Sequence, residues 1–396
     1  MSDLDLLVLG GGCAGLSLGV RLAEVPNDRR TVILEARQVY ENDRTWCFWR
    51  HRPHRFEHLV SQSWRRMEVS SADRHVAFDC DSNPYQLIPA DRFYAEAQQV
   101  IAASNAVSLS SGVTVLAAPF FEDDRWHVST SAGSLTARSI VDTRPGPGVQ
   151  TEDALLWQSF SGQEVECDAP VFDPNTAGLM HFITGRDGDI TFRYVLPSSA
   201  TRALIETTVF GVQRLRPADL AGAQAQAVER LCGSAAVRVL RTESGVLPMG
   251  IADHVRVAQP RYVRAGLMNG AARPSTGYAF QRIQSWAEMT AARIASGRDA
   301  QGHEPDPLLR RKMDRLFLQV LRAHPARGPE LFTRMFGNAG PDRVIRFLSD
   351  RATTADCVII GGHLPIGLFL GALARSLFGT ARVRSSDGLA ISGKAA

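Results

Sequence analysis

The chain has 396 residues, of which 44% are hydrophobic, so it is long enough for one large or two ordinary domains with a substantial core. Its 44 Lys and Arg residues against 41 Asp and Glu residues leave a formal net charge of +3, too small to indicate nucleic-acid binding. Six scattered cysteines form no C-x-x-C or Cys/His spacing, so we expect no metal and a reduced, cytoplasmic environment. The N-terminus enters a strand-like pattern directly and has no export-signal pattern.

The first 35 residues predict a β-α-β unit. The apolar run at 5–10 is typical of a buried parallel strand, residues 13–24 have helical spacing, and residues 31–35 indicate a second strand. The unit is the sequence signature of a Rossmann-type nucleotide-binding domain.

A glycine motif lies at the turn of this unit. Gly10, Gly12 and Gly15 form G-x-G-x-x-G, where the missing side chains permit a tight turn and let a pyrophosphate approach the helix N-terminus. Glu35 ends the second strand, where an acid accepts hydrogen bonds from a ribose. The alternative is a purely structural glycine turn. The N-terminal position and the Glu-Ala ending favour the ADP half of FAD, and no second such motif follows for a nicotinamide cofactor.

An aromatic segment, "RTWCFWRH", follows at 44–51. Trp46, Phe48 and Trp49 are interpreted either as core or as the wall of a substrate pocket near the cofactor, and the residues alone do not decide. Residues 85–102 predict a strand and then a helix with Asp91 as its N-cap.

Further along, three alternating segments between 111 and 144 predict an antiparallel meander, and the turn-rich stretch 144–150 predicts a boundary. Longer strands and one helix between 157 and 247 suit a sheet-based substrate domain. Residues 261–295 then predict a strand, a glycine-rich loop and a long helix, whose N-terminus is a second site available to a cofactor.

These elements predict a mixed α/β fold with two domains. A discontinuous FAD-binding domain would comprise 1–150 and 248–300, and an inserted antiparallel-sheet substrate domain would comprise 151–247. A helical, membrane-associating region would comprise 301–396.

Two apolar segments characterise this C-terminal region. The helix predicted around 310–321 has one apolar face, formed by Leu309, Met313, Leu316, Phe317, Val320 and Leu321. Such a face is typical of a core helix, but basic amphipathic helices also bind anionic membranes. Residues 357–374 carry no formally charged side chain, and Pro365 with four glycines favours a buried or interfacial segment over a transmembrane helix.

The chain resembles the bacterial lycopene β-cyclase family along its length. The stretches "TWCFW", "LIETT" and "PSTGYAF", in that order, carry the resemblance, together with "PYQLIPADRFY", "GVLPMG" and the glycine motif. The resemblance implies a flavoprotein that forms β-ionone end rings on lycopene, giving γ- and β-carotene, without net redox change. It also implies reduced FAD as the active cofactor, with NADPH or NADH as reductant.

The resemblance places the catalytic glutamate at Glu206. Cyclisation protonates an unactivated alkene, which needs a carboxylic acid kept protonated near neutral pH by burial. Alternation along the strand puts Glu206 on one face with Leu204, Thr208 and Phe210, as a lone ionisable group among less polar neighbours. Glu243 is a second candidate carboxylate, for which a turn or surface role is at least as consistent with the sequence.

The resemblance also implies that Thr276, Gly277 and Tyr278, at a helix N-terminus, lie near the flavin ring. The chain departs from the family pattern at His181 and Ile183, which replace an acid and a base, and many members have His where this chain has Arg273.

Partners and alternatives follow from these predictions. We expect a polyene hydrocarbon substrate, peripheral attachment to the cytoplasmic side of the membrane, and association with other carotenoid enzymes. The rival functions are a flavin monooxygenase or an isoprenoid reductase on the same fold, and a non-catalytic isoprenoid carrier. The sequence does not distinguish cyclisation of one end from cyclisation of both.

Overall fold

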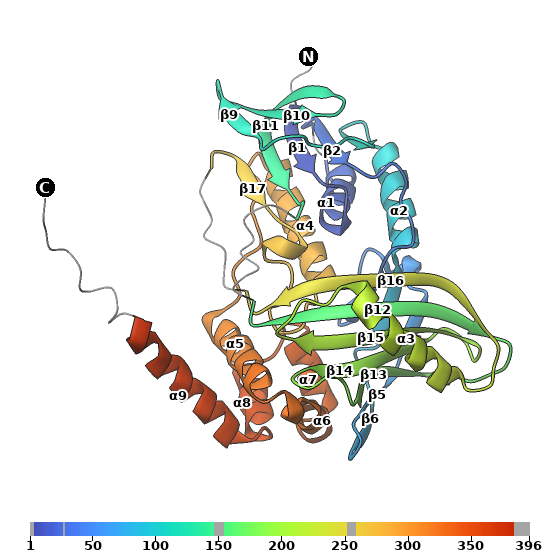
Figure 1. The fold of residues 1–396 in the computed structure, drawn as a ribbon. Coiled ribbons are helices and arrows are strands. Elements are labelled where there is room, and N and C mark those ends of the chain that lie inside the picture. Colours follow the sequence, from blue (N-terminus) through green and yellow to red (C-terminus); the bar gives the residue numbers. More distant parts are fainter. Residues whose placement is uncertain (1–3, 27, 146–153, 252–258, 384–396) are drawn as a thin grey trace, which may run out of the picture.

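A computed structural model describes residues 4–26, 28–145, 154–251 and 259–383. The predicted boundary at 144–150 lies largely outside these residues. A nucleotide-binding sheet forms one end of the molecule, a large sheet crosses the other end, and the C-terminal helices pack beside the large sheet (Figure 1).

The nucleotide-binding sheet has the order β8-β2-β1-β11-β10-β9, and β17 also pairs with β11. The parallel strands are β1 (Leu4–Leu9), β2 (Thr31–Glu35), β8 (Val107–Ser111), β11 (Gly133–Asp142) and β17 (Tyr262–Arg264). Two antiparallel strands extend it, β9 (Phe120–Glu122) and β10 (Arg125–Thr130). The helices of this part are α1 (Cys13–Glu24), α2 (Ala90–Ala102) and α4 (Phe280–Ala295), with a short 3-10 helix at Leu267–Asn269. The predicted β-α-β unit is confirmed.

Two local predictions in this region are wrong. Helix α2 begins at Ala90 after an extended Pro89, so Asp91 is not its N-cap but lies in its first turn, where a negative charge still complements the helix dipole. Residues 111–118 do not form the first strand of a meander. The strand ends at Ser111 because Gly112 turns the chain with φ +74°, and only an isolated bridge from Val115 to Thr130 follows.

The large sheet has the order β16-β12-β15-β14-β13-β5-β6. Its strands are β5 (Arg66–Ser70), β6 (His75–Asp79), β12 (Leu156–Cys167), β13 (Thr176–Ile183), β14 (Ile190–Pro197), β15 (Arg202–Gly211) and β16 (Val237–Met249). Helix α3 (Pro217–Cys232) covers one face, where Gln224 Oε1 accepts a hydrogen bond of 2.8 Å from Thr207 Oγ1. The strands predicted between 157 and 247 are confirmed, and β5 and β6 join them from within the range 1–150.

A small sheet joins the two ends of the molecule. It has the order β3-β7-β4, formed by β3 (Thr45–Trp49), β7 (Tyr85–Pro89) and β4 (Gln62–Trp64), and the 3-10 turn Glu57–Leu59 precedes β4. Gln62 Nε2 and Trp64 Nε1 donate hydrogen bonds of 2.8 and 3.0 Å to the carbonyl oxygens of Ser198 and Pro197 at the end of β14. The small sheet therefore lies against the large one.

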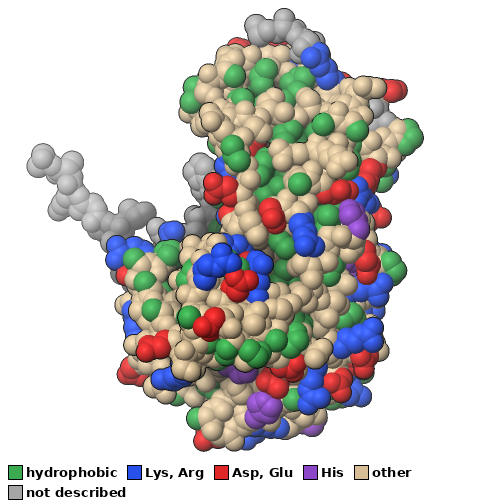
Figure 2. Space-filling model, turned by 90° about the vertical axis from the view of Figure 1, so that its right-hand side faces the viewer, with side chains coloured by type: hydrophobic (Ala, Val, Ile, Leu, Met, Phe, Trp, Pro, Cys, Tyr) green, Lys and Arg blue, Asp and Glu red, His purple; other side chains and the backbone are tan. Residues whose placement is uncertain are grey.

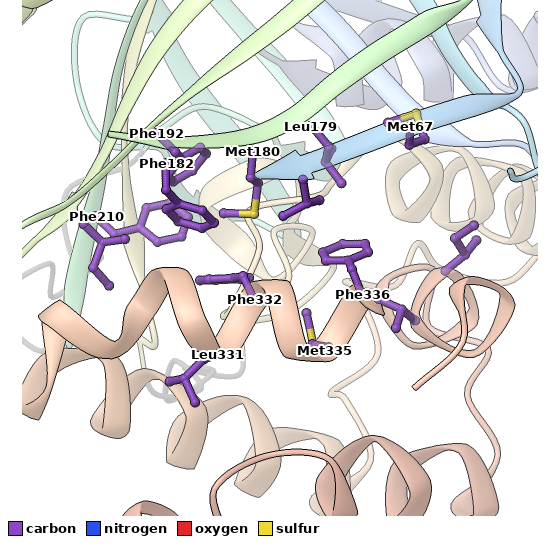
Figure 3. Close-up of a cluster of buried hydrophobic side chains, with 14 of the residues drawn as sticks. Met67, Leu179, Met180, Phe182, Phe192, Phe210, Leu331, Phe332, Met335 and Phe336 are labelled. Atoms are coloured by element: carbon purple, nitrogen blue, oxygen red, sulfur yellow. The ribbon is translucent and has the colours of Figure 1, made fainter. Parts of the chain in front are cut away.

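The C-terminal helices cover the other face of the large sheet. They are α5 (Leu308–Ala323), α6 (Gly328–Asn338), α7 (Pro341–Leu348), α8 (Thr354–Gly362) and α9 (Ile366–Val383), with a 3-10 turn at Pro325–Arg327. Figure 3 shows α6 directing Phe332 and Phe336 toward the sheet, where Phe332 stacks on Phe182 with ring centroids 5.6 Å apart. Burial of these aromatic rings fixes the helices on the sheet.

The face of α5 that is buried differs from the predicted one. Val320 and Leu321 are buried as expected, but Leu309 is 53% exposed, and Asp314 and Leu318 are buried instead. The cause is an ion pair between Asp314 and the buried Arg273, which draws a polar position of the helix into the core. Elsewhere on the surface, acidic and basic side chains alternate without a large region of one sign on the face shown in Figure 2.

Candidate active site

The glycine motif forms a turn that a nucleotide fits. A Cβ on Gly15 would lie 2.0 Å from the carbonyl oxygen of Gly10, so the close contact between helix and strand excludes any side chain there. Gly10 has φ +97°, which favours glycine. Gly12 is the N-cap of α1, so no side chain caps the first N–H groups of the helix, and a Cβ added at Gly12 would have no atom within 4 Å. The helix N-terminus thus faces open space, as a pyrophosphate requires.

Glu35 is held against this turn. Its Oε2 accepts a hydrogen bond of 2.8 Å from the backbone N–H of Gly11, and its Oε1 accepts hydrogen bonds of 2.9 Å from the backbone and 3.1 Å from Nε of Arg37. Burial opposes ionisation, but the hydrogen bonds and charge of Arg37 outweigh it and lower the pKa of Glu35. Arg37 Nη2 also donates to Oε2 at 3.3 Å, so each oxygen already accepts two hydrogen bonds, and a ribose hydroxyl would share or replace one of the bonds from Arg37. No pattern in the sequence pointed to Arg37.

The second cofactor loop contacts the large sheet. Thr276, Gly277 and Tyr278 precede α4, and Gly277 has φ +71°. A Cβ on Gly277 would lie 3.2 Å from both Gln158 Oε1 and Leu247 Cδ1. Gln158 Oε1 is buried without a hydrogen-bond partner in the described part of the chain, so an acceptor lies beside this loop where a polar ligand group can donate to it.

The aromatic segment is divided between two environments by strand alternation. Trp46 and Phe48 stack on Phe280 at 5.4 and 5.1 Å, on the side of the nucleotide-binding domain. Trp49 contacts Tyr278 edge to face at 5.6 Å. Phe48 and Trp49 line a cleft of about 390 Å³ together with Tyr278, whereas Trp46 does not line it.

The other face of the same strand contributes polar groups that the sequence analysis missed. Thr45 and Cys47 alternate with the stacked aromatics, and Thr45 donates a hydrogen bond of 2.7 Å to Glu243 of the large sheet. The alternation of β3 shows that Thr45 and Cys47 share one face of the strand. Nothing in the sequence indicates that this face is turned toward the large sheet, so the sequence analysis did not identify them as site residues.

Glu206 lies in the middle of the large sheet, on the face opposite α3. In register it is next to Gly162 of β12 and Tyr194 of β14. The predicted alternation is confirmed, because Leu204 and Phe210 belong to the core beneath the C-terminal helices. Glu206 Oε1 accepts a hydrogen bond of 2.7 Å from Thr208 Oγ1, and no cation contacts it among the described residues.

Burial raises the pKa of Glu206 to about 8, and the charge of Glu243 adds to the effect. The prediction that Glu206 is a lone ionisable group is therefore wrong. Glu243 lies within β16 and is only 8% exposed, which also rules out the turn or surface role. The two residues are 37 positions apart, and only the strand order places them together. Among the described residues no cluster of His, Cys, Asp and Glu suits a metal ion.

Comparison with known proteins identifies the family of this chain. The family described as lycopene cyclase protein matches residues 5–373. The chain belongs to the lycopene cyclase family. A lycopene β-cyclase from Pantoea ananas is 24% identical over 383 residues, covering 91% of this chain and 95% of that protein.

Solved structures share the fold across most of the chain. A flavin-dependent brominase aligns with a TM-score of 0.62 at 11% identity, covering 91% of this chain and 98% of the brominase. A geranylgeranyl bacteriochlorophyll reductase-like protein from Thermoplasma acidophilum aligns with a TM-score of 0.57 at 12% identity, covering 94% and 96%. The predicted mixed α/β fold with a Rossmann-type unit is confirmed. These likenesses establish the fold alone.

The departures from the family pattern lie away from Glu206. His181 pairs in register with Arg193 and Ile183 with Thr191, on the α3 side of the sheet. His181 Nδ1 lies 2.8 Å from Ser70 Oγ, and its ring fills the space over Gly178. His181 therefore packs within the sheet, on the face opposite that of Glu206.

Arg273 is also structural. It is 1% exposed and makes a bidentate ion pair with Asp314, with Nε–Oδ2 and Nη2–Oδ1 distances of 3.0 and 2.8 Å. Its guanidinium also lies 4.4 Å from the ring centre of Phe347. Arg273 thereby attaches α5 and α7 to the cofactor loop.

Proposed function

We propose that this protein is a lycopene β-cyclase, an isomerase of the intramolecular lyase type that forms β-ionone rings on lycopene to give γ- and β-carotene. Membership of the lycopene cyclase family supports the class of reaction. The observation that carries the mechanism is the carboxyl of Glu206, which burial holds protonated at neutral pH on a sheet face lined by aromatic rings.

The reaction requires a proton and no oxidant. Glu206 donates its proton to the inner carbon of the terminal double bond of the polyene, and the resulting tertiary cation is attacked by a neighbouring alkene, which forms the ring bond. Loss of a ring proton to the Glu206 carboxylate completes the new double bond and restores the acid. Aromatic faces such as that of Tyr194, which lies beside Glu206, stabilise a cation and exclude water.

FAD is the cofactor that the site fits. The open helix N-terminus at Gly12 would hold the pyrophosphate, Glu35 the ribose, and the loop of Thr276, Gly277 and Tyr278 would border the flavin ring. In its reduced anionic form, with NADPH or NADH as reductant, the flavin would supply negative charge that stabilises a developing cation. The buried acceptor of Gln158 beside Gly277 supports a polar ligand at this place.

The substrate implies a membrane surface, because a long polyene hydrocarbon partitions into the bilayer. Among the described residues, no single helix is long and apolar enough to cross a membrane. Helix α8 and residues 366–375 of α9 together have the length and composition of a membrane-spanning segment, but the two helices are bent by 107° relative to each other. Exposed apolar side chains on these helices include Val358, Ile366 and Leu370. They support peripheral attachment to a membrane, which we place on its cytoplasmic face, where other carotenoid enzymes would associate.

The test is ring formation by Glu206→Gln in cells that accumulate lycopene. We expect FAD content and membrane binding to persist while β-carotene falls by about 10²–10⁴-fold, because Gln keeps the shape and removes the acid. Glu166→Gln, an exposed glutamate of β12 paired with Arg238, is the matched control and should cyclise normally. Undiminished cyclisation by Glu206→Gln would remove Glu206 from this role.

Other functions occur on the same fold, which a reductase-like protein shares, so they have to be separated by experiment. An isoprenoid reductase or a monooxygenase consumes NAD(P)H in proportion to product, whereas a cyclase needs it only to reduce the flavin. Measuring NAD(P)H oxidation per molecule of product separates them. A protein that binds polyene and converts none would be a carrier.

A further inference from the structure

A row of residues crosses four neighbouring strands of the large sheet, from the edge strand β16 to β14. In register, Glu243 of β16 and Glu206 of β15 both lie opposite Gly162 of β12, and Tyr194 of β14 lies on the far side of Glu206. Directly paired residues of antiparallel strands project to the same face. The two glutamates therefore project from the same face, separated only by a residue without a side chain.

Gly162 allows the two glutamate side chains to approach each other. A Cβ at Gly162 would lie 3.3 Å from Glu206 Cβ, 3.4 Å from Glu206 Cγ and 3.3 Å from Glu243 Cγ. Both side chains thus lie above the glycine, where any larger residue would keep them apart.

The two carboxyl groups have different partners. Glu243 Oε2 accepts hydrogen bonds of 2.7 Å from Thr45 Oγ1 and 2.5 Å from Arg241 Nη1, and Arg241 Nη2 donates to Thr45 Oγ1 at 2.6 Å. Arg241 also contacts Glu164 at 2.7 Å and lines a polar cleft of about 290 Å³. Glu243 therefore has the surroundings of a fixed carboxylate. Glu206 has only the hydroxyl of Thr208.

The remaining ionisable groups around Glu206 are neutral at pH 7. Burial raises the pKa of each, so none supplies a positive charge or competes as an acid near neutrality. They are Cys47 of β3, Tyr194 of β14 and Tyr278 of the cofactor loop, and Tyr85 of β7 lies beside these three residues. Because Arg241 is shared by Glu243 and Glu164 and does not contact Glu206, the proton belongs on Glu206.

We propose that Glu243 is a positioning residue for the cyclisation, whose carboxylate, fixed by Arg241 and Thr45, keeps Glu206 protonated and ready to donate. The inference rests on the proposed function, because it assumes that Glu206 is the acid. Glu243 itself transfers no proton. The negative charge of Glu243 disfavours ionisation of Glu206, because two carboxylates would then lie side by side over Gly162.

The test is the pH dependence of Glu243→Gln in the FAD-loaded protein. Ring formation requires protonated Glu206, so the rate falls as pH rises through the pKa of that group. Removing the neighbouring negative charge lowers this pKa, and the alkaline midpoint should move down by about 1–3 pH units. Glu164→Gln is the control, since it also removes a contact of Arg241 but lies in the next row of the sheet, and its midpoint should not move.

A readout without turnover separates this inference from the proposed function. In substrate-free protein, infrared difference spectroscopy detects the carbonyl stretch of a protonated carboxyl, assigned to Glu206 by its loss in Glu206→Gln. Its titration midpoint should be lower in Glu243→Gln than in the wild type. An unshifted midpoint overturns the role of Glu243 while leaving Glu206 as the acid. Normal cyclisation by Glu206→Gln instead removes Glu206 as the acid on which this inference rests, and a wild-type protein that forms no ring overturns the proposed function.

A second variant tests the same inference if Glu243→Gln does not fold. Arg241→Gln/Glu243→Gln removes both charges and leaves neither unpaired, which avoids the cost of an isolated buried ion. The charge that raises the pKa of Glu206 is that of Glu243, so the midpoint should again fall. A midpoint equal to or above that of the wild type in this variant contradicts the inference.

Discussion

At the scale of single residues, the chemistry of each buried glutamate depends on whether a cationic side chain contacts its carboxyl group. Glu206 accepts one hydrogen bond from a hydroxyl, while Glu243 and Glu35 are each contacted by a guanidinium. The same side-chain type is thus an acid at one place and a carboxylate at the others, because only the latter have a positive charge beside them.

The raised pKa of Glu206 predicts a pH dependence of stability. The pKa is 4.5 for the free side chain and about 8 in the folded protein, so between these pH values the folded state holds a proton that the unfolded state has lost. Stability therefore falls as pH rises through this window. Glu206→Gln removes this loss and should gain on the order of 4 kcal/mol relative to wild type between pH 5 and pH 9. Chemical denaturation at both pH values measures it, and parallel changes in the two proteins would contradict it.

Arg273 gives a second prediction at this scale. Arg273→Met leaves Asp314 buried without its cation and should cost about 3–5 kcal/mol of unfolding free energy. Arg273→Met/Asp314→Leu removes both charges and should recover most of the loss. Urea denaturation of both variants checks this. Arg334→Met, which breaks an exposed ion pair with Glu330, is the control and should cost about 1 kcal/mol or less. A double variant as unstable as the single one would contradict the assignment.

At the scale of elements, the β-α-β unit presents the cofactor turn. The helix N-terminus of α1 faces open space at Gly12, and the loop before α4 lies against the large sheet. The nucleotide-binding domain and the large sheet would thereby meet at the cofactor site that we propose.

Gly12→Val tests this element. The side chain would occupy the space that we assign to the pyrophosphate, so the purified variant should lose most of its flavin absorbance per chain while remaining folded. Gly222→Val, at an exposed position of α3 with no atom near its Cβ position, is the matched control and should retain the flavin. Full flavin content in Gly12→Val would show that the pyrophosphate lies elsewhere.

The sequence predicts what short periodicities encode. It predicts the strand and helix around Gly10–Gly15, the alternation that directs Glu206 to one face, and the helix after Tyr278. It does not predict that Glu243 lies near Glu206, because the order of β15, β12 and β16 is a long-range property. The burial of Asp314 was missed for the same reason, since its partner Arg273 is 41 residues away.

At the scale of the whole molecule, the C-terminal helices connect the active sheet to an apolar edge. Phe332 contacts Phe182 of the sheet on one side and Phe317 of α5 on the other, and Phe317 stacks on Phe369 of α9. Helix α9 lies at the edge of the molecule (Figure 1). A membrane-bound polyene would approach the protein from this side.

Membrane docking is tested by replacing apolar side chains on this edge. Val358→Asp/Leu370→Asp should abolish co-sedimentation with vesicles that contain anionic lipid, because burying a charge in the bilayer interface opposes binding. Leu116→Asp, at a 63% exposed position of the nucleotide-binding domain, should bind like the wild type. Equal loss in both variants, or in neither, would contradict the assigned surface.

The central claim, that a protonated protein carboxyl starts a cyclisation without net redox change, is tested most directly by turnover in heavy water. The wild-type protein with reduced flavin should give product that carries one deuterium for each ring formed, because the added proton comes from an exchangeable acid, and it should consume no NAD(P)H in proportion to product. Unlabelled rings, or NAD(P)H oxidised in step with product, would contradict it.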